Sequence, residues 1–224
     1  MISRYSLYTT ADLRDRFALA DGLPKGVKPH YSIYPTHQAP VIVGQDGHPV
    51  VEQMGWGLTP KGAKDTNSVF RYKTYNVPSE KILAKHSWEI AVRHSRCLVP
   101  ANGFYQLNES GDEKRAYYIQ LKNTAMFAFA GIYSKWEDAG ITRATYSIIT
   151  SEAPDQVRHI ADRMPIILSK SEERRWLDVS ITDANALFDM LRPISRDQLL
   201  INEVGAGIHS LKIDSPKLIV PLEK

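Results

Sequence analysis

Short apolar runs separated by polar turns dominate the middle of the chain and predict β-strands. Val41–Val43 is one strand candidate, and Asp46-Gly47 follows it with a glycine that tolerates positive φ, which predicts a hairpin. Later runs rich in β-branched and aromatic residues predict strands at 96–99, 104–107, 117–121, 127–132 and 146–150. Because these runs follow one another closely, they favour an antiparallel sheet or barrel over an alternating βαβ arrangement.

Helical spacing of apolar residues is confined to short stretches. The first, Thr10–Leu19, places Leu13 and Phe17 on one face. Similar spacing predicts helices in 79–94, 155–159, 171–177 and 183–191. Gly, Pro and polar residues predict loops at 22–32, 61–67 and 108–114, and the segment 208–221 has extended character. The expected fold is therefore α+β and mainly β, with short helices at the periphery of an antiparallel sheet or barrel.

Composition bounds the class of protein. The 224 residues are 43% hydrophobic and 24% charged, so we expect one globular domain over residues 1–224. Apolar runs are too short to cross a bilayer and the first residues lack a signal-peptide pattern, which predicts a cytoplasmic protein. The single cysteine, Cys97, excludes an intrachain disulfide, and no metal site or other cofactor is expected. A net charge of +3 permits nucleic-acid binding without arguing for it.

Several separated motifs together resemble one family. They are Ser3-Arg4-Tyr5, Gly55-Trp56-Gly57-Leu58, Asn76 with Glu80, the run Arg96 to Tyr105 (RCLVPANGFY), the run Phe129 to Tyr133 (FAGIY) and the run Asp162 to Leu168 (DRMPIIL). Their content and order resemble the SOS-response-associated peptidase (SRAP) family across nearly the whole chain. The resemblance implies a β-rich fold with a positively charged groove that binds single-stranded DNA.

The same resemblance implies a covalent chemistry. Family members remove Met1 and use the amine and thiol of a cysteine at position 2 to form a thiazolidine with the aldehyde of an abasic site. An asparagine and a glutamate lie beside that terminus, and a histidine precedes the Asp-Arg of the last motif. Here the corresponding residues are Ile2, Asn76, Gln106 and Ala161.

Three of these four positions depart from the pattern. Ile2 has no nucleophile, and its bulk makes removal of Met1 unfavourable. Gln106 keeps the size of the glutamate but cannot exchange a proton near neutral pH, and Ala161 has no titratable group. Thiazolidine formation is therefore excluded, and we expect a pseudoenzyme in which Asn76 and Gln106 mark the former catalytic site. His159 is a substitute base in one interpretation and a surface histidine in another.

DNA binding is a separate question, because it needs charge and stacking surfaces rather than proton transfer. The candidate DNA-binding residues are Arg4, Arg71, Tyr75, Asn76 and Arg163. The alternative for Arg4 and Arg163 is a structural role, with Asp162 or Glu80 as ion-pair partner. Tyr72 and Lys73 extend the basic and aromatic cluster around Arg71, and a solvated strand has the same pattern. Pro78 stands where relatives often carry arginine.

Three functions follow from these residues. The first is binding of single-stranded, abasic or junction DNA in a DNA-damage (SOS) response without a cysteine crosslink. The second is residual chemistry by the terminal amine, as an abasic-site lyase or autopeptidase. The third is a protein-interaction scaffold without DNA. We assign no catalytic role to Trp56, which is expected in the core, or to Cys97, which is expected in a buried strand.

Overall fold

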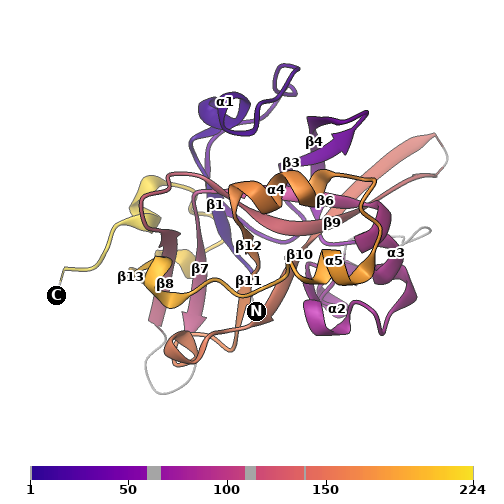
Figure 1. Ribbon diagram of the computed structural model, residues 1–224. Helices are drawn as coiled ribbons and strands as arrows, with labels where there is room; N and C mark the ends of the chain where they lie inside the picture. The colour runs from indigo at the N-terminus through magenta and orange to yellow at the C-terminus, as the bar shows by residue number, and fades with distance from the viewer. Residues whose placement is uncertain (1, 60–66, 109–114, 139, 224) are drawn as a thin grey trace.

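The computed structural model describes residues 2–59, 67–108, 115–138 and 140–223, and it places two β-sheets at the centre with short helices around them (Figure 1). The strands are β1 Tyr5–Leu7, β2 His30–Ile33, β3 Gln38–Gln45, β4 His48–Trp56, β5 Asn76–Pro78, β6 Arg96–Ala101, β7 Gly103–Asn108, β8 Arg115–Leu121, β9 Phe127–Asp138, β10 Ile141–Glu152, β11 Arg163–Pro165, β12 Ile167–Leu168 and β13 Leu199–Val204. The helices are α1 Leu13–Phe17, α2 Asn67–Arg71, α3 His86–His94, α4 Lys170–Leu177 and α5 Ala184–Phe188. Single 3-10 turns lie at Thr10–Asp12, Ser79–Lys81, Asp155–Val157, Arg196–Gln198, Ala206–His209 and Pro216–Ile219.

The larger sheet closes on itself. Its strands run in the order β10-β4-β3-β6-β9, and β9 pairs back with β10, so these strands form a ring. Strands β5 and β11 also pair with β10, β5 in parallel and β11 antiparallel. Closure leaves few edges on which another chain can pair, and it encloses side chains from every second position of each strand.

The smaller sheet has the order β13-β8-β7-β1-β2 and is antiparallel throughout. The chain passes from the ring to this sheet at Asn102, the residue between β6 and β7. The Asn102 side chain accepts from the backbone of Tyr8 at 2.7 Å and donates to Ala125 O at 2.7 Å, so it fixes the crossing. Gly103 follows, where an added Cβ would lie 2.3 Å from the Tyr118 ring, so only glycine fits this close approach.

Aromatic side chains fill the interior of the ring. Tyr5 packs edge-on against Trp56 and Phe129, with ring centroids 5.2 and 5.9 Å apart, and its hydroxyl lies 2.6 Å from that of Tyr146. Trp56 is fully buried, as the sequence predicts. Cys97 is also fully buried, and burial raises the pKa of its thiol, which makes it unreactive.

Most expected elements are present. Each of the five later strand predictions falls within β6 to β10, and Asp46 and Gly47, at φ 50° and 79°, close the predicted hairpin between β3 and β4. The mainly β, α+β fold class is confirmed. The predicted helix at 79–94 is interrupted, because only Ser79–Lys81 and His86–His94 are helical.

Other expectations were wrong. The segment 208–221 is not extended but contains two 3-10 turns, and β2 begins at His30 inside the predicted loop. The solvated strand, the alternative for the cluster around Arg71, is not observed, because the residues before Tyr75 form α2 and a turn. Residues 60–66 and 109–114, which hold most of two predicted loops, lie outside the described residues. No helix in the described part of the chain is long and apolar enough to span a membrane.

Candidate functional site

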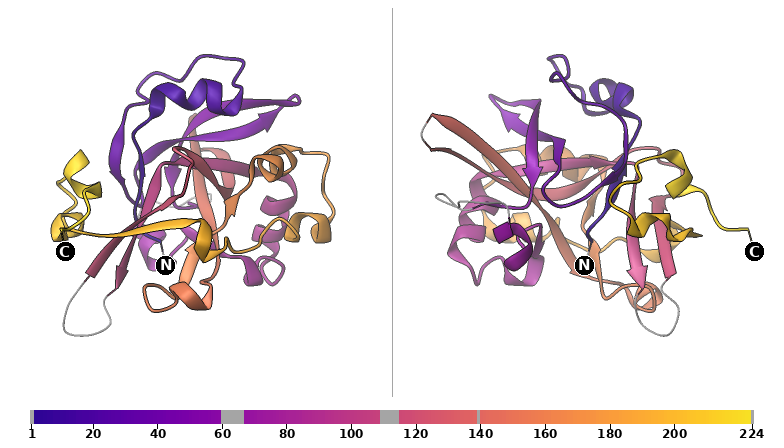
Figure 2. Two further views of the ribbon diagram at one scale, coloured as in Figure 1. Left: turned by 60° about the vertical axis from the view of Figure 1, so that its left-hand side comes forward. Right: turned by 180° about the vertical axis from the view of Figure 1, so that it is seen from behind.

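The start of the chain lies against β5, in the region of β10 and β11 (Figures 1 and 2). Ile2 is fully buried, and its carbonyl accepts a hydrogen bond from Asn76 Nδ2 at 2.6 Å. Asn76 is only 2% exposed, and its Oδ1 has no hydrogen-bond partner among the described residues. Position 2, which carries a thiol in the family pattern, therefore holds a buried hydrocarbon side chain here. The Asn76 amide fixes the backbone carbonyl of the same residue. Met1 lies outside the described residues.

The side chain of Gln106 contacts the backbone of Arg163. Gln106 lies on β7 and is 2% exposed, and its Nε2 donates to the backbone carbonyl of Arg163, on β11, at 2.9 Å. A neutral amide can donate this bond, whereas a carboxylate cannot. Ala161 is half-buried and packs against the main hydrophobic core. We call Ile2, Asn76, Gln106 and Ala161 the N-terminal site.

The Arg163 guanidinium is held by protein groups. It binds the Glu80 carboxylate in a fork, at 2.5 and 3.0 Å, and also donates to Thr150 O and Oγ1 at 2.9 and 3.2 Å. The hydrogen bond from Arg163 is the largest cause that lowers the pKa of Glu80. The structural alternative for Arg163, with Glu80 as partner, is thus the observed geometry, and a DNA phosphate must compete with Glu80.

Arg4 is buried at 7% exposure, and its side chain contacts β2 and the C-terminal segment. Its NH1 donates to Ser32 Oγ at 2.9 Å and to Ser210 O at 3.1 Å, and its guanidinium lies 5.5 Å from the centroid of the Tyr34 ring. Burial lowers the pKa of Arg4. These contacts tie β1 to β2 and to the C-terminal segment, so Arg4 can reach DNA only if its neighbours move.

The basic and aromatic cluster predicted before Asn76 lies at the surface. Helix α2 ends at Arg71, and Lys73 turns the chain with φ 50°. Phe70 and Tyr72 are 52% and 66% exposed. We call Phe70, Arg71, Tyr72 and Lys73 the α2 surface, because all four side chains are exposed. Sequence reasoning did not include Phe70 in the site, although an aromatic residue beside Arg71 was a usable signal.

Tyr75 links the α2 surface to the core. Its ring is half-buried and packs edge-on against Trp56, with centroids 6.2 Å apart, and burial raises the pKa of its hydroxyl. Trp56 Nε1 donates to Tyr75 O at 2.8 Å. Because Asn76 follows Tyr75 directly, these contacts fix the distance between the exposed α2 surface and the buried N-terminal site.

His159 lies at the surface near the end of β7. Its backbone carbonyl accepts from Asn108 Nδ2 at 2.9 Å and its side chain is exposed. This environment favours the surface interpretation over a role as a substitute base. In the described part of the chain, no group of three His, Cys, Asp or Glu side chains is arranged to hold a metal ion.

The sequence matches the family described as SOS response associated peptidase (SRAP) over residues 1–211. The chain belongs to this family. The abasic site processing protein YoaM of Bacillus subtilis is 32% identical over 223 residues, which cover 98% of this chain and 97% of that protein. The abasic site processing protein HMCES of Gallus gallus is 30% identical, with 88% of this chain and 67% of that protein covered. A crystal structure of a protein from Bacteroides thetaiotaomicron matches with a TM-score of 0.87 at 24% identity, covering 98% and 99% of the two chains.

The SRAP resemblance predicted from the motifs is therefore confirmed, and it assigns the fold. In this SRAP protein the residues Ile2, Asn76 and Gln106 contribute amide groups and hydrocarbon surface. Among these three, none offers a nucleophile or a group that titrates near neutral pH. Such a site can form hydrogen bonds and exclude water. Proton transfer during covalent capture of an aldehyde requires other groups.

Proposed function

We propose that this SRAP protein binds single-stranded DNA, including DNA with an abasic site, without forming a cysteine-based crosslink, and that it acts in the response to DNA damage. The abasic site processing activity named for its relatives supports DNA as the partner. The expected compartment is the cytoplasm. In this proposal the protein keeps the fold of the family, but its N-terminal site lacks the family's nucleophile and is the site of a pseudoenzyme.

The observation that carries this proposal is the environment of Ile2. Its side chain is fully buried, and the Asn76 amide holds its carbonyl at 2.6 Å. A thiazolidine requires an amine and a thiol on the same residue, and isoleucine has no thiol. The neighbouring Gln106 uses its amide to hold the β11 backbone and cannot serve as general acid or base near neutral pH.

The α2 surface supports the binding half of the proposal. Nucleobases stack on exposed aromatic rings, and phosphates bind nearby cations, without any need for a nucleophile. Phe70 and Tyr72 supply exposed rings, and Arg71 and Lys73 supply charge beside them. Tyr75 and Asn76 lead from this surface to the buried site, and Arg163 can add a phosphate contact if it exchanges Glu80 for DNA. Arg4 contributes to DNA binding in this proposal only if its contacts with Ser32 and Ser210 open.

The experiment is a fluorescence-anisotropy titration with three oligonucleotides of one length: abasic single strand, intact single strand and duplex. Each is measured at low and at physiological salt. We expect the single strands to bind more tightly than duplex and all affinities to fall with salt, because phosphate contacts release counterions. If none of the three oligonucleotides shows salt-sensitive binding, the proposal is contradicted and the protein-interaction scaffold is supported.

Borohydride treatment of the same mixtures separates binding from chemistry by the terminal amine. Borohydride reduces an imine to a stable amine, so a trapped product on abasic DNA identifies a Schiff base and supports the lyase alternative. The proposal predicts that borohydride traps no more of this protein on abasic DNA than of a control protein that does not recognise abasic sites. A control protein with exposed lysines sets the background for non-specific trapping.

A further inference from the structure

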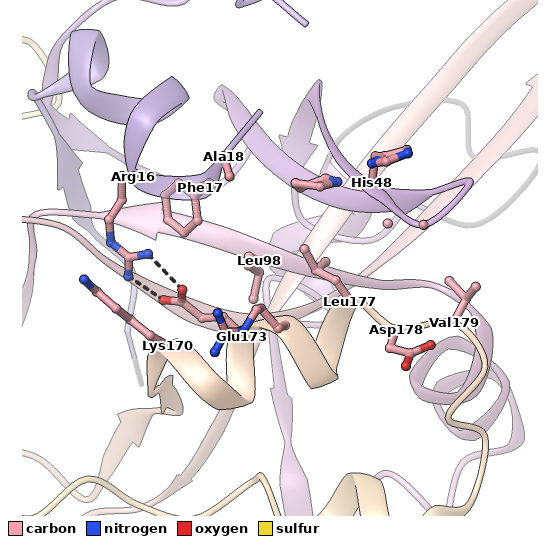
Figure 3. Close-up of a pocket in the computed structure, with 14 residues that line it drawn as sticks. Arg16, Phe17, Ala18, His48, Leu98, Lys170, Glu173, Leu177, Asp178 and Val179 are labelled. Atoms are coloured by element: carbon pink, nitrogen blue, oxygen red, sulfur yellow. Dashed lines mark hydrogen bonds and ion pairs between the residues drawn. The ribbon is translucent and has the colours of Figure 1, made fainter. Parts of the chain in front are cut away.

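A cavity of about 590 Å³ opens between α4 on one side and α1 with the β3–β4 hairpin on the other (Figure 3). Its volume lies within the range of roughly 300–1,000 Å³ that is typical of small-molecule sites. The residues that line it come from α1, the hairpin, β6, α4 and the positions directly after the two helices, and none of them belongs to the N-terminal site or the α2 surface.

Tight contacts fix two walls of this cavity. Arg16, on α1, binds the buried Glu173 carboxylate, on α4, with two hydrogen bonds at 2.9 and 2.7 Å, and its Nε donates to Met126 O at 3.1 Å. Gly44 lies so close to α4 that an added Cβ would be 2.3 Å from Leu177 O. The cavity is therefore preformed, which lowers the entropic cost of binding a ligand.

The inner part of the cavity is apolar. Figure 3 shows Phe17 and Leu98 facing the space between α1 and α4, with Leu177 on the opposite wall. Phe17 is 8% exposed and Leu98 is 1% exposed, so both are fixed by the core behind them. This part suits a hydrocarbon or aromatic group, which gains by leaving water.

Helix α4, which forms one wall of the cavity, carries two exposed cations that line it, Lys170 and Arg174. Lys170, Arg174 and Leu177 are spaced by four and three residues, which places them on one face of α4. Among the described residues, neither cation has a carboxylate within 4.0 Å, whereas the charge of Arg16 is matched by Glu173. The rim acid Asp178 is bound to Ser180 N and Oγ at 3.0 and 2.6 Å.

From this arrangement we propose that the cavity binds a small amphipathic anion. An acyl or aryl body occupies the apolar part between Phe17, Leu98 and Leu177. A carboxylate, sulfonate or phosphate on that body is bound by Lys170 and Arg174, whose charges it complements. The inference does not rest on the DNA-binding proposal.

The test uses two probes, decanoate and anilinonaphthalene sulfonate, with decanol as the uncharged counterpart of decanoate. Isothermal titration calorimetry on the full chain measures affinity, and the melting temperature reports binding independently, since a ligand of the folded state raises it. We expect saturable binding of at least one anionic probe, and weaker binding of decanol than of decanoate. Failure of both anionic probes to bind saturably overturns the proposal.

Variants locate the site. Arg174→Gln and Lys170→Gln are each expected to weaken binding of the anion roughly two- to fivefold, the range for one solvent-exposed ion pair. Arg175→Gln is the matched control, because Arg175 is exposed on the same helix and does not line the cavity. Val179→Asp adds a negative charge at the cavity and should also weaken binding, whereas Val220→Asp, at nearly equal exposure of 57% against 58%, should not. Equal affinities for the cavity variants and their controls overturn the proposal.

Discussion

The N-terminal site and the α2 surface are connected through Tyr75 and Asn76, and they differ in nearly every physical respect. Ile2, Asn76 and Gln106 are almost entirely buried and bound by short hydrogen bonds, whereas Phe70 and Tyr72 expose more than half of their surface. Covalent catalysis needs a few groups in fixed positions, so one lost nucleophile abolishes it. DNA binding adds up many exposed contacts, so it survives changes at a single buried position.

Under the proposed function, this difference would allow the fold to lose its covalent chemistry and keep a binding surface. The amide of Asn76 and the amide of Gln106 each fix backbone, and that structural role does not depend on a thiol at position 2. The rings of Phe70 and Tyr72 are exposed, and Phe70 contacts Tyr75, which in turn packs against the buried Trp56. Function therefore follows the site rather than the fold.

The largest effect is expected when the missing catalytic groups are restored to the N-terminal site, which would remove its chemical difference from other family members. The variant Ile2→Cys, Gln106→Glu, Ala161→His should form a product with abasic single-stranded DNA that survives denaturation, provided that Met1 is removed from the smaller second residue. The rate should exceed that of Ile2→Cys alone by about 100-fold, the lower range for general acid–base catalysis. Denaturing electrophoresis measures it, and the same variant with Ser at position 2 is the control. Equal crosslinking by the wild-type chain contradicts the account.

A second test removes the rings of the α2 surface. Phe70→Ala and Tyr72→Ala should each weaken binding of single-stranded DNA roughly tenfold, because stacking of one base contributes about 1–3 kcal/mol. Leu211→Ala is the control, since Leu211 is a similarly exposed apolar residue, at 58%, on the C-terminal segment. Anisotropy titrations measure the affinities. Unchanged affinity in both ring variants removes the α2 surface from the binding site.

A third test measures how much the buried region contributes to stability. Asn76→Ala removes the donor to the buried Ile2 carbonyl, and an unsatisfied buried carbonyl costs about 1–3 kcal/mol of unfolding free energy. Urea unfolding followed by circular dichroism measures the change. Asn185→Ala, at an exposed position of α5, should change stability far less. If both substitutions have the same effect, the Asn76 bond is not structural.

A fourth test concerns the charges of the α2 surface. Arg71→Gln and Lys73→Gln should each reduce the slope of log affinity against log salt by about 0.7 for single-stranded DNA, the value for one phosphate contact. Lys122→Gln and Lys217→Gln change exposed lysines outside the α2 surface and should leave the slope unchanged. A slope that responds equally to all four variants indicates a diffuse charge effect rather than a binding surface.

The smallest expected effect is on pH dependence. Hydrogen bonding by Arg163 lowers the pKa of Glu80 below its value of about 4.3 in the unfolded chain. Its contribution to stability is therefore present above that unfolded value and is lost as pH falls through the lower pKa of the folded state. Because Glu80 is 45% exposed, the contribution should stay below about 1 kcal/mol. The difference in urea midpoint between wild type and Glu80→Gln should shrink from pH 7 to pH 3, and Glu223→Gln should show no such trend.

The sequence predicts the strands of the core because local patterns dominate there. β-branched and aromatic runs mark β6 to β10, and Asp46-Gly47 has the backbone freedom that its turn requires. The two 3-10 turns of the C-terminal segment were not predicted, because apolar Ile208, Leu218 and Ile219 resemble a strand when the segment is considered alone. In the structure, short-range bonds such as Ser210 N to Gly207 O and Leu218 N to Ser215 O curl that segment.

The sequence predicted which residues belong to the site better than it predicted how they are arranged in space. Motifs identified Asn76, Gln106 and Arg163, but only the fold brings Gln106 against the Arg163 carbonyl, 57 residues away in the chain. Sequence left the role of Arg163 open, and the ion pair with Glu80 depends on β5 and β11 flanking β10. The burial of Arg4 under Ser210 depends on a contact across 206 residues, which no local pattern reveals.

The central claim is that DNA is bound and not covalently captured, and one experiment addresses it directly. A labelled abasic single strand is incubated with the wild-type chain, and the same mixture is run on native and on denaturing gels. The account predicts a shifted band on the native gel that returns entirely to free DNA on the denaturing gel. A shifted band that persists after denaturation contradicts it.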